Sequence, residues 1–169
     1  MKRYFLMLSL LVIAGDGFSK EAPRALDKAN VLPLALDDAF QFRKTIIFLN
    51  DPQLNKPTYD PMIAFERRRL DFGAINSYER RQREGHYFKF FWRTKRKADL
   101  TVRVEYRQQN LGAYVQAREI SYKDAKGSFE SEFDVIGSDY ADDGKVSGWR
   151  VVLIENGKIV GLTQSFLWN

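Results

Sequence analysis

The histidine and cysteine content limits the chemistry of this chain more than any other feature. His86 is the only histidine and there is no cysteine, so zinc sites of the usual nitrogen and sulfur type are excluded. A Ser-His-Asp arrangement around His86 is arithmetically possible, but no serine has the glycine pattern of a nucleophile elbow. His86 also lies at an expected turn just before a strand, where a solvated side chain is the simpler interpretation. We therefore expect a protein that is not an enzyme and that needs no metal or other cofactor.

Acidic side chains form a second group toward the end of the chain. They are Glu130, Glu132, Asp134, Asp139, Asp142 and Asp143. Residues 139–144 partly resemble a calcium-binding loop, but Ala141 occupies the third position and Arg150 the position of the bidentate glutamate. The first three carboxylates could supply a pair for glycoside hydrolysis, yet alternation along a strand places them on one exposed face. We interpret the group as an acidic turn between strands.

Basic side chains form the most distinctive feature of the expected surface. The candidate polyanion-binding residues, called the basic segment below, are Arg67, Arg68, Arg69, Arg80, Arg81, Arg83, Arg93, Lys95, Arg96 and Lys97. Aromatic residues such as Tyr78 and Phe91 are interleaved with them, a combination that nucleic-acid-binding proteins use. The same chemistry binds anionic lipid headgroups or acidic polysaccharide. The alternative is an ordinary solvated face, partly neutralised by acidic residues such as Glu66 and Glu79.

Residues 1–19 have the layout of a secretory signal peptide. Basic residues at positions 2 and 3 give a positive start, and an uncharged apolar run follows from Tyr4 to Ala14. This run is shorter than the roughly twenty apolar residues that a membrane-spanning helix needs. We expect cleavage after Ser19, or alternatively after Ala14, and export to the periplasm or the medium. The mature chain would then have no stable membrane anchor, and export would separate it from nucleic acid.

The mature chain is expected to be held together by its hydrophobic core alone. Removing residues 1–19 takes away two basic residues and one acidic residue, so the formal charge falls from +5 to +4. A chain of about 150 residues buries roughly 68–70% of its unfolded surface and needs no disulfide. The mild positive charge permits attraction to anionic surfaces but does not demand it.

The mature chain divides into two parts. Residues 20–60 read as a loosely structured lead-in, with a helix expected over 37–49 that an aspartate could cap. Residues 61–169 are expected to form a short helix followed by a β-sandwich. Asp60, Pro61 and Gly73 are the cap, first-turn proline and terminator that this short helix would use.

From Tyr87 the hydrophobic period changes to two, which predicts strands over 87–94, 100–106, 114–122 and 129–136. A final hairpin turns at Asn156-Gly157, a pair typical of a type I′ turn. Its expected register pairs residue 155 with 158, 153 with 160, and 151 with 162. Trp149, Val151, Leu153, Val160, Leu162 and Phe166 would then share a core face. An apolar pair of Ile154 and Ile159 would lie on the other face.

Residues 72–169 resemble an immunoglobulin-like or fibronectin-type sandwich. The residues that carry the resemblance are the aromatic strand 88–92, the alternating strand 100–106 and the Trp149-led strand 148–154 with its returning partner. The layout is also similar to small uncharacterised bacterial exported proteins that end in a strand like Ser165-Phe166-Leu167-Trp168. The resemblance implies a mainly β fold, an antiparallel immunoglobulin-like β-sandwich of about seven strands, after a signal peptide and one or two short helices. It implies no catalytic residue.

The sequence therefore favours an exported, non-enzymatic β-sandwich that serves as a binding or structural module of the cell envelope. Its expected partner is an envelope protein or an anionic polymer. The alternative is a carbohydrate-binding module or a polysaccharide-directed enzyme. That alternative requires exposed rings such as Phe91, Tyr114, Tyr122 and Trp168 to lie flat on one sheet face.

Overall fold

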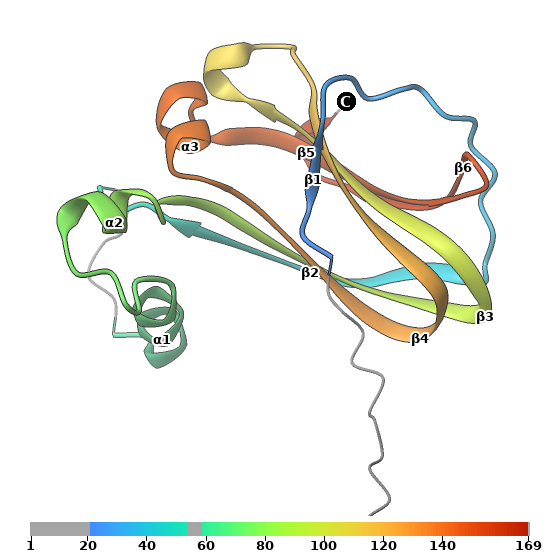
Figure 1. The fold of residues 1–169 in the computed structure, drawn as a ribbon, viewed down its shortest axis with the longest axis horizontal. Helices are drawn as coiled ribbons and strands as arrows, with labels where there is room; N and C mark the ends of the chain where they lie inside the picture. The colour runs from blue at the N-terminus through green and yellow to red at the C-terminus, as the bar shows by residue number, and fades with distance from the viewer. Residues whose placement is uncertain (1–20, 54–58, 169) are drawn as a thin grey trace, which may run out of the picture.

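The computed structural model describes residues 21–53 and 59–168, and the fold is mainly β, with 54% of residues in strands and 19% in helices (Figure 1). Six strands form one antiparallel sheet: β1 (Arg24–Leu26), β2 (Phe40–Asn50), β3 (Gly85–Gln108), β4 (Gln116–Ile136), β5 (Val146–Glu155) and β6 (Lys158–Gln164). The α-helices are α1 (Pro61–Leu70), α2 (Ser77–Arg81) and α3 (Ser138–Asp143), and two 3₁₀ helices span Gln109–Leu111 and Phe166–Trp168. The strand expected at residues 165–168 is therefore wrong, because this segment forms a helical turn after β6. The expected signal peptide, residues 1–19, lies outside the described residues. Within the described part, no helix is long and apolar enough to span a bilayer.

The architecture depends on the long hairpin of β3 and β4, which pair from Gly85↔Ile136 to Tyr106↔Gln116. The first half of β3 also pairs with β2, and its second half pairs with β5, which in turn pairs with β6. Between Thr94 and Leu100 the register shifts and the ribbon bends (Figure 1). The bend brings the two halves of the sheet face to face, and Phe90 of one half lies 5.4 Å from Trp149 of the other.

One hydrophobic core fills the space between the halves. Its buried members include Phe88, Phe90 and Trp92 from the first half and Val104 and Val151 from the second. The strands expected over 87–94 and 100–106 are thus one strand, as are those over 114–122 and 129–136. The polar residues between them form a bulged bend rather than a chain reversal, so the structure has six strands instead of about seven.

The helix expected over 37–49 is wrong, because these residues enter β2. Asp37 does cap a turn, since its carboxylate accepts the Ala39 N–H at 2.8 Å, but an extended strand follows. The β2–β3 register shifts between Phe42 and Lys44. This bulge interrupts the alternation of apolar residues, which explains why β2 does not match a strand pattern in the sequence.

The short helix α1 follows its capping signals. The Asp60 side chain accepts hydrogen bonds from the Met62 and Ile63 backbone N–H groups, at 2.8 Å and 3.4 Å, and Pro61 occupies the first turn. Gly73, with a φ of 83°, lies two residues beyond the C-cap Asp71. The local sequence alone was therefore sufficient to predict this helix.

The final hairpin has the expected turn and a partly different register. Pairs Glu155↔Lys158 and Ile154↔Ile159 are as predicted, but a bulge then pairs Leu153 with Gly161. The expected pairs of 153 with 160 and of 151 with 162 are therefore wrong. Val160, the extra residue, still reaches the core, whereas Leu162 is 37% exposed and Phe166 is 91% exposed.

The lead-in covers the outer face of this hairpin. Ile154 and Ile159 are buried there together with Val152, and Leu32 packs against them. Backbone hydrogen bonds from Ala35 N to Ile159 O and from Ile159 N to Pro33 O, of 2.8 Å and 2.9 Å, hold the segment in place. The outer apolar pair is thus part of a second small core.

The bulge at Val160 predicts unequal effects of two leucine substitutions in the hairpin. Leu153→Ala should lower the free energy of unfolding by about 3 kcal/mol, because it empties space in a fully buried site. Leu162→Ala should lower it by less than about 1 kcal/mol, since this side chain already contacts water. Urea denaturation followed by tryptophan fluorescence measures both values. Equal losses would show that Leu162 faces the core after all.

Candidate functional site

The segment between β2 and β3 stands apart from the core and holds most of the basic segment. Residues 59–84, here called the α1–α2 projection, carry α1 and α2 beyond the end of the β2–β3 ladder (Figure 1). Neither helix contributes a buried residue. Polar contacts attach the projection to the sheet: Asn50 Nδ2 and the Tyr87 hydroxyl donate to Arg83 O at 3.0 Å and 2.8 Å. The projection is therefore positioned by hydrogen bonds rather than by hydrophobic packing.

Arg83 has a structural role within the projection. Its guanidinium donates to the carbonyl oxygen of Leu70, the last residue of α1, at 3.0 Å and to that of Phe72, two residues later. A cation at a helix C-terminus also interacts favourably with the helix dipole. Arg83 was predicted as a polyanion-binding residue, but its Nη1 donates both of these hydrogen bonds within the protein.

The structure divides the basic segment into two groups. Arg67, Arg68, Arg69, Arg80, Arg81 and Arg83 lie in the projection, and Arg93, Lys95, Arg96 and Lys97 lie at the bend of β3. The two groups lie at opposite ends of the first half of β3. Residue 93 lies eight residues along this strand from residue 85, or roughly 26 Å at about 3.3 Å per residue. Arg69 reaches farther toward the bend, since it lines a hollow together with Phe91. The ten residues do not form one continuous patch.

At the bend, Arg96 is already paired with two carboxylates. Arg96 forms ion pairs with Glu155 at 2.5 Å and Asp37 at 3.1 Å, and its guanidinium lies 4.5 Å from the centre of the Phe40 ring. Hydrogen bonds to Glu155 and then to Asp37 raise the pKa of Arg96. Arg96 thus joins the lead-in, the bend and the final hairpin. Lys97 pairs with Asp124 at 3.0 Å, an exposed contact of little energetic weight.

The projection holds the more available cations. Arg69 pairs with Glu66 at 2.9 Å, while the Arg68 Nε donates to Ala64 O within its own helix at 3.3 Å. Arg80 and Arg81 are exposed and form no ion pair among residues 21–53 and 59–168, although the charge of Arg81 partly offsets the rise that burial causes in the pKa of Glu84. Arg68, Arg80 and Arg81 are thus exposed cations of the projection that form no ion pair within the described chain.

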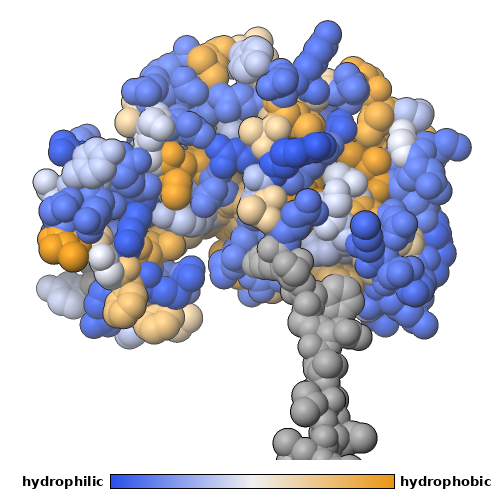
Figure 2. Space-filling view, in the orientation of Figure 1, coloured by the Kyte–Doolittle hydropathy of each residue, from blue (hydrophilic) through white to orange (hydrophobic). Residues whose placement is uncertain are grey.

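Apolar side chains on the same projection are exposed, and the sequence analysis did not identify them as a group. Ile75 and Phe72 are 87% and 84% exposed, and Met62, Phe65 and Tyr78 are exposed as well. Figure 2 shows hydrophobic side chains among hydrophilic ones on the projection, at the left of the view. One feature of the sequence could have revealed this group: the apolar residues of α1 lie among arginines instead of forming one stripe that faces the core.

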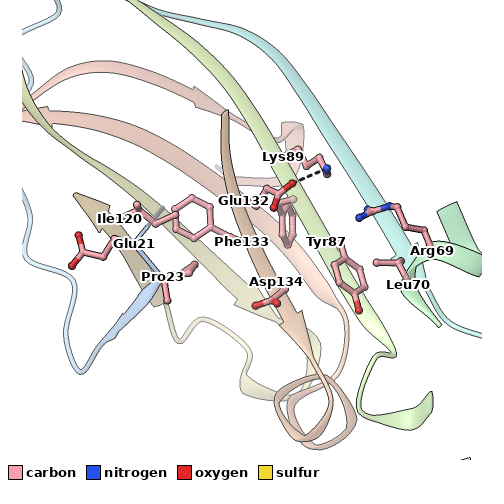
Figure 3. A pocket seen from close by; sticks show the side chains of 12 residues that line it. Glu21, Pro23, Arg69, Leu70, Tyr87, Lys89, Ile120, Glu132, Phe133 and Asp134 are labelled. Carbon is pink, nitrogen blue, oxygen red and sulfur yellow. Dashed lines mark ion pairs between the residues drawn. The ribbon is translucent and has the colours of Figure 1, made fainter. Parts of the chain in front are cut away.

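A hollow lies between α1 and the outer face of the sheet. One part, about 280 Å³, is lined by apolar side chains that include Ile46, Phe48 and Met62. The adjoining part, about 360 Å³, has Arg69 and Tyr87 on one side and reaches Glu21 and Pro23 on the other (Figure 3). Arg69, Leu70, Tyr87 and Lys89 line the two parts together.

Lys89 and Tyr87, which line both parts of the hollow, have polar partners within the protein. Lys89 forms ion pairs with Glu132 at 2.7 Å and with Glu130 at 3.4 Å, and the hydrogen bond to Glu132 raises the pKa of Lys89 (Figure 3). Burial raises the pKa of Tyr87 to about 12, so its hydroxyl keeps the proton that it donates to Arg83 O. Neither Lys89 nor Tyr87 is poised for proton transfer near neutral pH.

Two further members of the acidic group, Asp134 and Asp139, are paired as well. Arg118 pairs with Asp139 at 2.5 Å and with Asp134 at 3.3 Å. Residues 138–143 form α3, and the Gln108 amide donates to Asp139 O and Gly144 O at 2.7 Å and 2.8 Å. No group of three or more potential metal-ligating side chains occurs among the described residues.

His86 does not occupy a solvated turn, which corrects the sequence interpretation. It is the second residue of β3, half-buried, with its ring stacked 5.8 Å from Phe88 and edge-on 5.9 Å from Tyr140. Neither ring nitrogen has a hydrogen-bond partner in the described structure. Burial, aided by the charge of Lys145 and opposed by Asp51, lowers the pKa of His86 to about 4.

The rings that a sugar-binding platform requires do not share one face. Trp168 is only 8% exposed and packs beneath the guanidinium groups of Arg107 and Arg150. Tyr122 packs against Trp92 at a ring distance of 5.0 Å, and its hydroxyl lies 2.7 Å from Ser131 Oγ. Of the four expected rings, only Tyr114 is exposed.

The role of Arg83 predicts a local effect of its removal. Arg83→Ala should accelerate amide hydrogen exchange in residues 61–82, because the carbonyls after α1 lose their donor. The melting temperature should fall by less than about 4 °C, since the core is untouched. Hydrogen exchange measured by mass spectrometry tests this, with the exposed Arg80→Ala as control. Equal exchange in the two variants would show that Arg83 does not hold the projection.

The buried neutral imidazole predicts a loss of stability in acid. The unfolded chain binds a proton at His86 near pH 6.5, but the folded chain binds it only near pH 4. The contribution is therefore present above pH 6.5 and is lost as the pH falls toward 4, by about 2 kcal/mol after allowance for partial exposure. His86→Phe, which keeps an aromatic ring, should remove this part of the pH dependence in urea denaturation at pH 7, 5 and 4. Parallel curves for the two proteins would contradict the assignment.

Comparison with known proteins assigns no relative to this chain. No protein-family model matches it. No curated protein and no solved structure is significantly similar to it. Inference about function therefore rests on the chemistry of the described residues.

Proposed function

We propose that the protein is an exported, non-enzymatic β-domain that binds an anionic component of the cell envelope through the α1–α2 projection. The observation that carries the proposal is the set Arg68, Arg80 and Arg81, three arginines on a segment that stands out from the core. None of the three arginines belongs to the core, so a ligand can bind them without disturbing the sheet. The pattern of residues 1–19 supports export, and export favours envelope polyanions over nucleic acid.

The fold type belongs to the same proposal. Two halves of a sheet that face each other across one core are consistent with a β-sandwich. The continuity of β3 and β4 through both halves differs from the two separate sheets of immunoglobulin-like domains. The immunoglobulin-like assignment therefore remains a prediction that rests on the sequence resemblance alone.

A heparin column tests the proposal with the mature chain that starts at residue 20. Substituting Arg68, Arg80 and Arg81 by alanine together should weaken binding at least about tenfold and lower the eluting salt concentration. The reason is that each arginine near an anionic surface contributes on the order of 1 kcal/mol. The interaction should also weaken as salt rises, because exposed charges are screened.

The bend of the sheet offers a matched control. Arg93→Ala, Lys95→Ala and Lys126→Ala together remove the same charge from exposed positions at the bend of the β3–β4 ribbon. This variant should bind heparin nearly as well as the unmodified chain. Equal weakening in the two triple variants would mean that total charge, and not the projection, governs retention.

A further inference from the structure

We infer that the anionic surface bound by the α1–α2 projection is that of a lipid bilayer, into whose interface the exposed apolar side chains of the projection insert. The inference rests on the proposed function and names its partner. Seven of the sixteen exposed large apolar side chains in the described chain fall between residues 59 and 78. Such a concentration in one short segment marks an interaction surface, because monomeric soluble proteins rarely expose contiguous apolar patches of this kind.

The apolar and cationic side chains are neighbours on the projection. In α1, residues three and four apart share a face, so Phe65 lies beside Met62 and is followed on that face by Arg68 and Arg69. In α2, the same spacing places Tyr78 beside Arg81. On each helix, apolar side chains thus neighbour guanidinium groups. Interfacial segments of membrane-bound proteins combine these two kinds of side chain.

Besides the cap residue Asp60, three of the five acidic residues of the projection have contacts within the protein. Glu66 pairs with Arg69, and the Glu79 carboxylate accepts the Ile75 N–H at 2.6 Å and caps the entry to α2. Asp71 accepts a hydrogen bond from Asn50 at 3.5 Å, at the base of the projection. These contacts reduce the repulsion of an anionic surface, while Arg68 and Arg81 remain exposed.

A bilayer fits this surface better than an acidic polysaccharide does. Both an acidic polysaccharide and an anionic lipid headgroup would pair with the arginines. A hydrated polysaccharide, however, provides no apolar phase for Phe72 and Ile75. These two side chains occupy the connection between α1 and α2, where nothing in the described chain covers them. The lipid interface provides anionic headgroups and an apolar boundary within a few ångströms.

The apolar part of the hollow extends the same surface toward the sheet. Met62 belongs at once to the exposed set and to the lining that it forms with Ile46 and Phe48. Since the hollow opens beside α1, the apolar surface continues from the projection onto the outer face of β2. This continuity gives the interface more area than two short helices could supply.

Vesicle binding tests the inference with the mature chain from residue 20, which retains every described residue and lacks the apolar leader. Sedimentation with vesicles of phosphatidylcholine and phosphatidylglycerol should recover the protein, whereas pure phosphatidylcholine vesicles should recover little. Phe65→Ala, Phe72→Ala and Ile75→Ala together should lower the partition coefficient at least roughly tenfold. The same variant should elute from heparin like the unmodified chain.

A matched apolar control lies elsewhere on the protein. Tyr114→Ala, Phe166→Ala and Leu167→Ala together remove three exposed apolar side chains from outside the projection, and vesicle binding should persist. Circular dichroism of each variant checks that the sheet is folded. Unchanged vesicle binding by the Phe65, Phe72 and Ile75 variant would overturn the inference.

The two assays separate this inference from the proposed function. Arginine-dependent retention on heparin without recovery on phosphatidylglycerol vesicles would overturn the bilayer as partner and leave polyanion binding intact. Failure to bind either heparin or vesicles would overturn both. Recovery on vesicles that depends on the arginines and on the rings is the result that supports both.

Discussion

The bend in the β3–β4 ribbon is the constraint on which the rest of the structure depends. The core face of β3 keeps the same alternation through the bend, from Phe88 and Phe90 to Val102 and Val104. In β4 the alternation changes between Ile120 and Phe133, because the register shifts at the bend. Two strands can therefore serve both halves of the sheet and enclose one core between them. No disulfide contributes, since the chain has no cysteine.

Local sequence signals predicted the elements whose causes are themselves local. The cap at Asp60 fixed the start of α1, and Asn156 adopts the positive φ of 49° that its turn requires. The predictions for β2 and for the register of the final hairpin failed because of β-bulges. A single extra residue moves every later side chain to the opposite face of the strand. The bulge near Lys44 concealed β2, and the bulge at Val160 displaced Leu162 from the core.

The candidate site was predictable in composition but not in geometry. Residue types alone identified a basic segment, yet the partners of its members come from distant parts of the chain. Arg96 is joined to Asp37 and Glu155, each 59 residues away, and no periodicity encodes such pairs. Arg83 acts on backbone carbonyls, which the sequence does not distinguish. Only the fold separates engaged cations from available ones.

The projection also explains why exposed apolar side chains are tolerated. Its helices bury nothing, so their substitution has little effect on the core, and the polar contacts of Asn50 and Arg83 are enough to orient them. Because the core does not depend on this surface, its residues can be selected for binding a partner. Exposing Phe72 and Ile75 to water is unfavourable, and nothing within the described chain offsets that cost. A partner that covers these side chains would convert the cost into binding free energy.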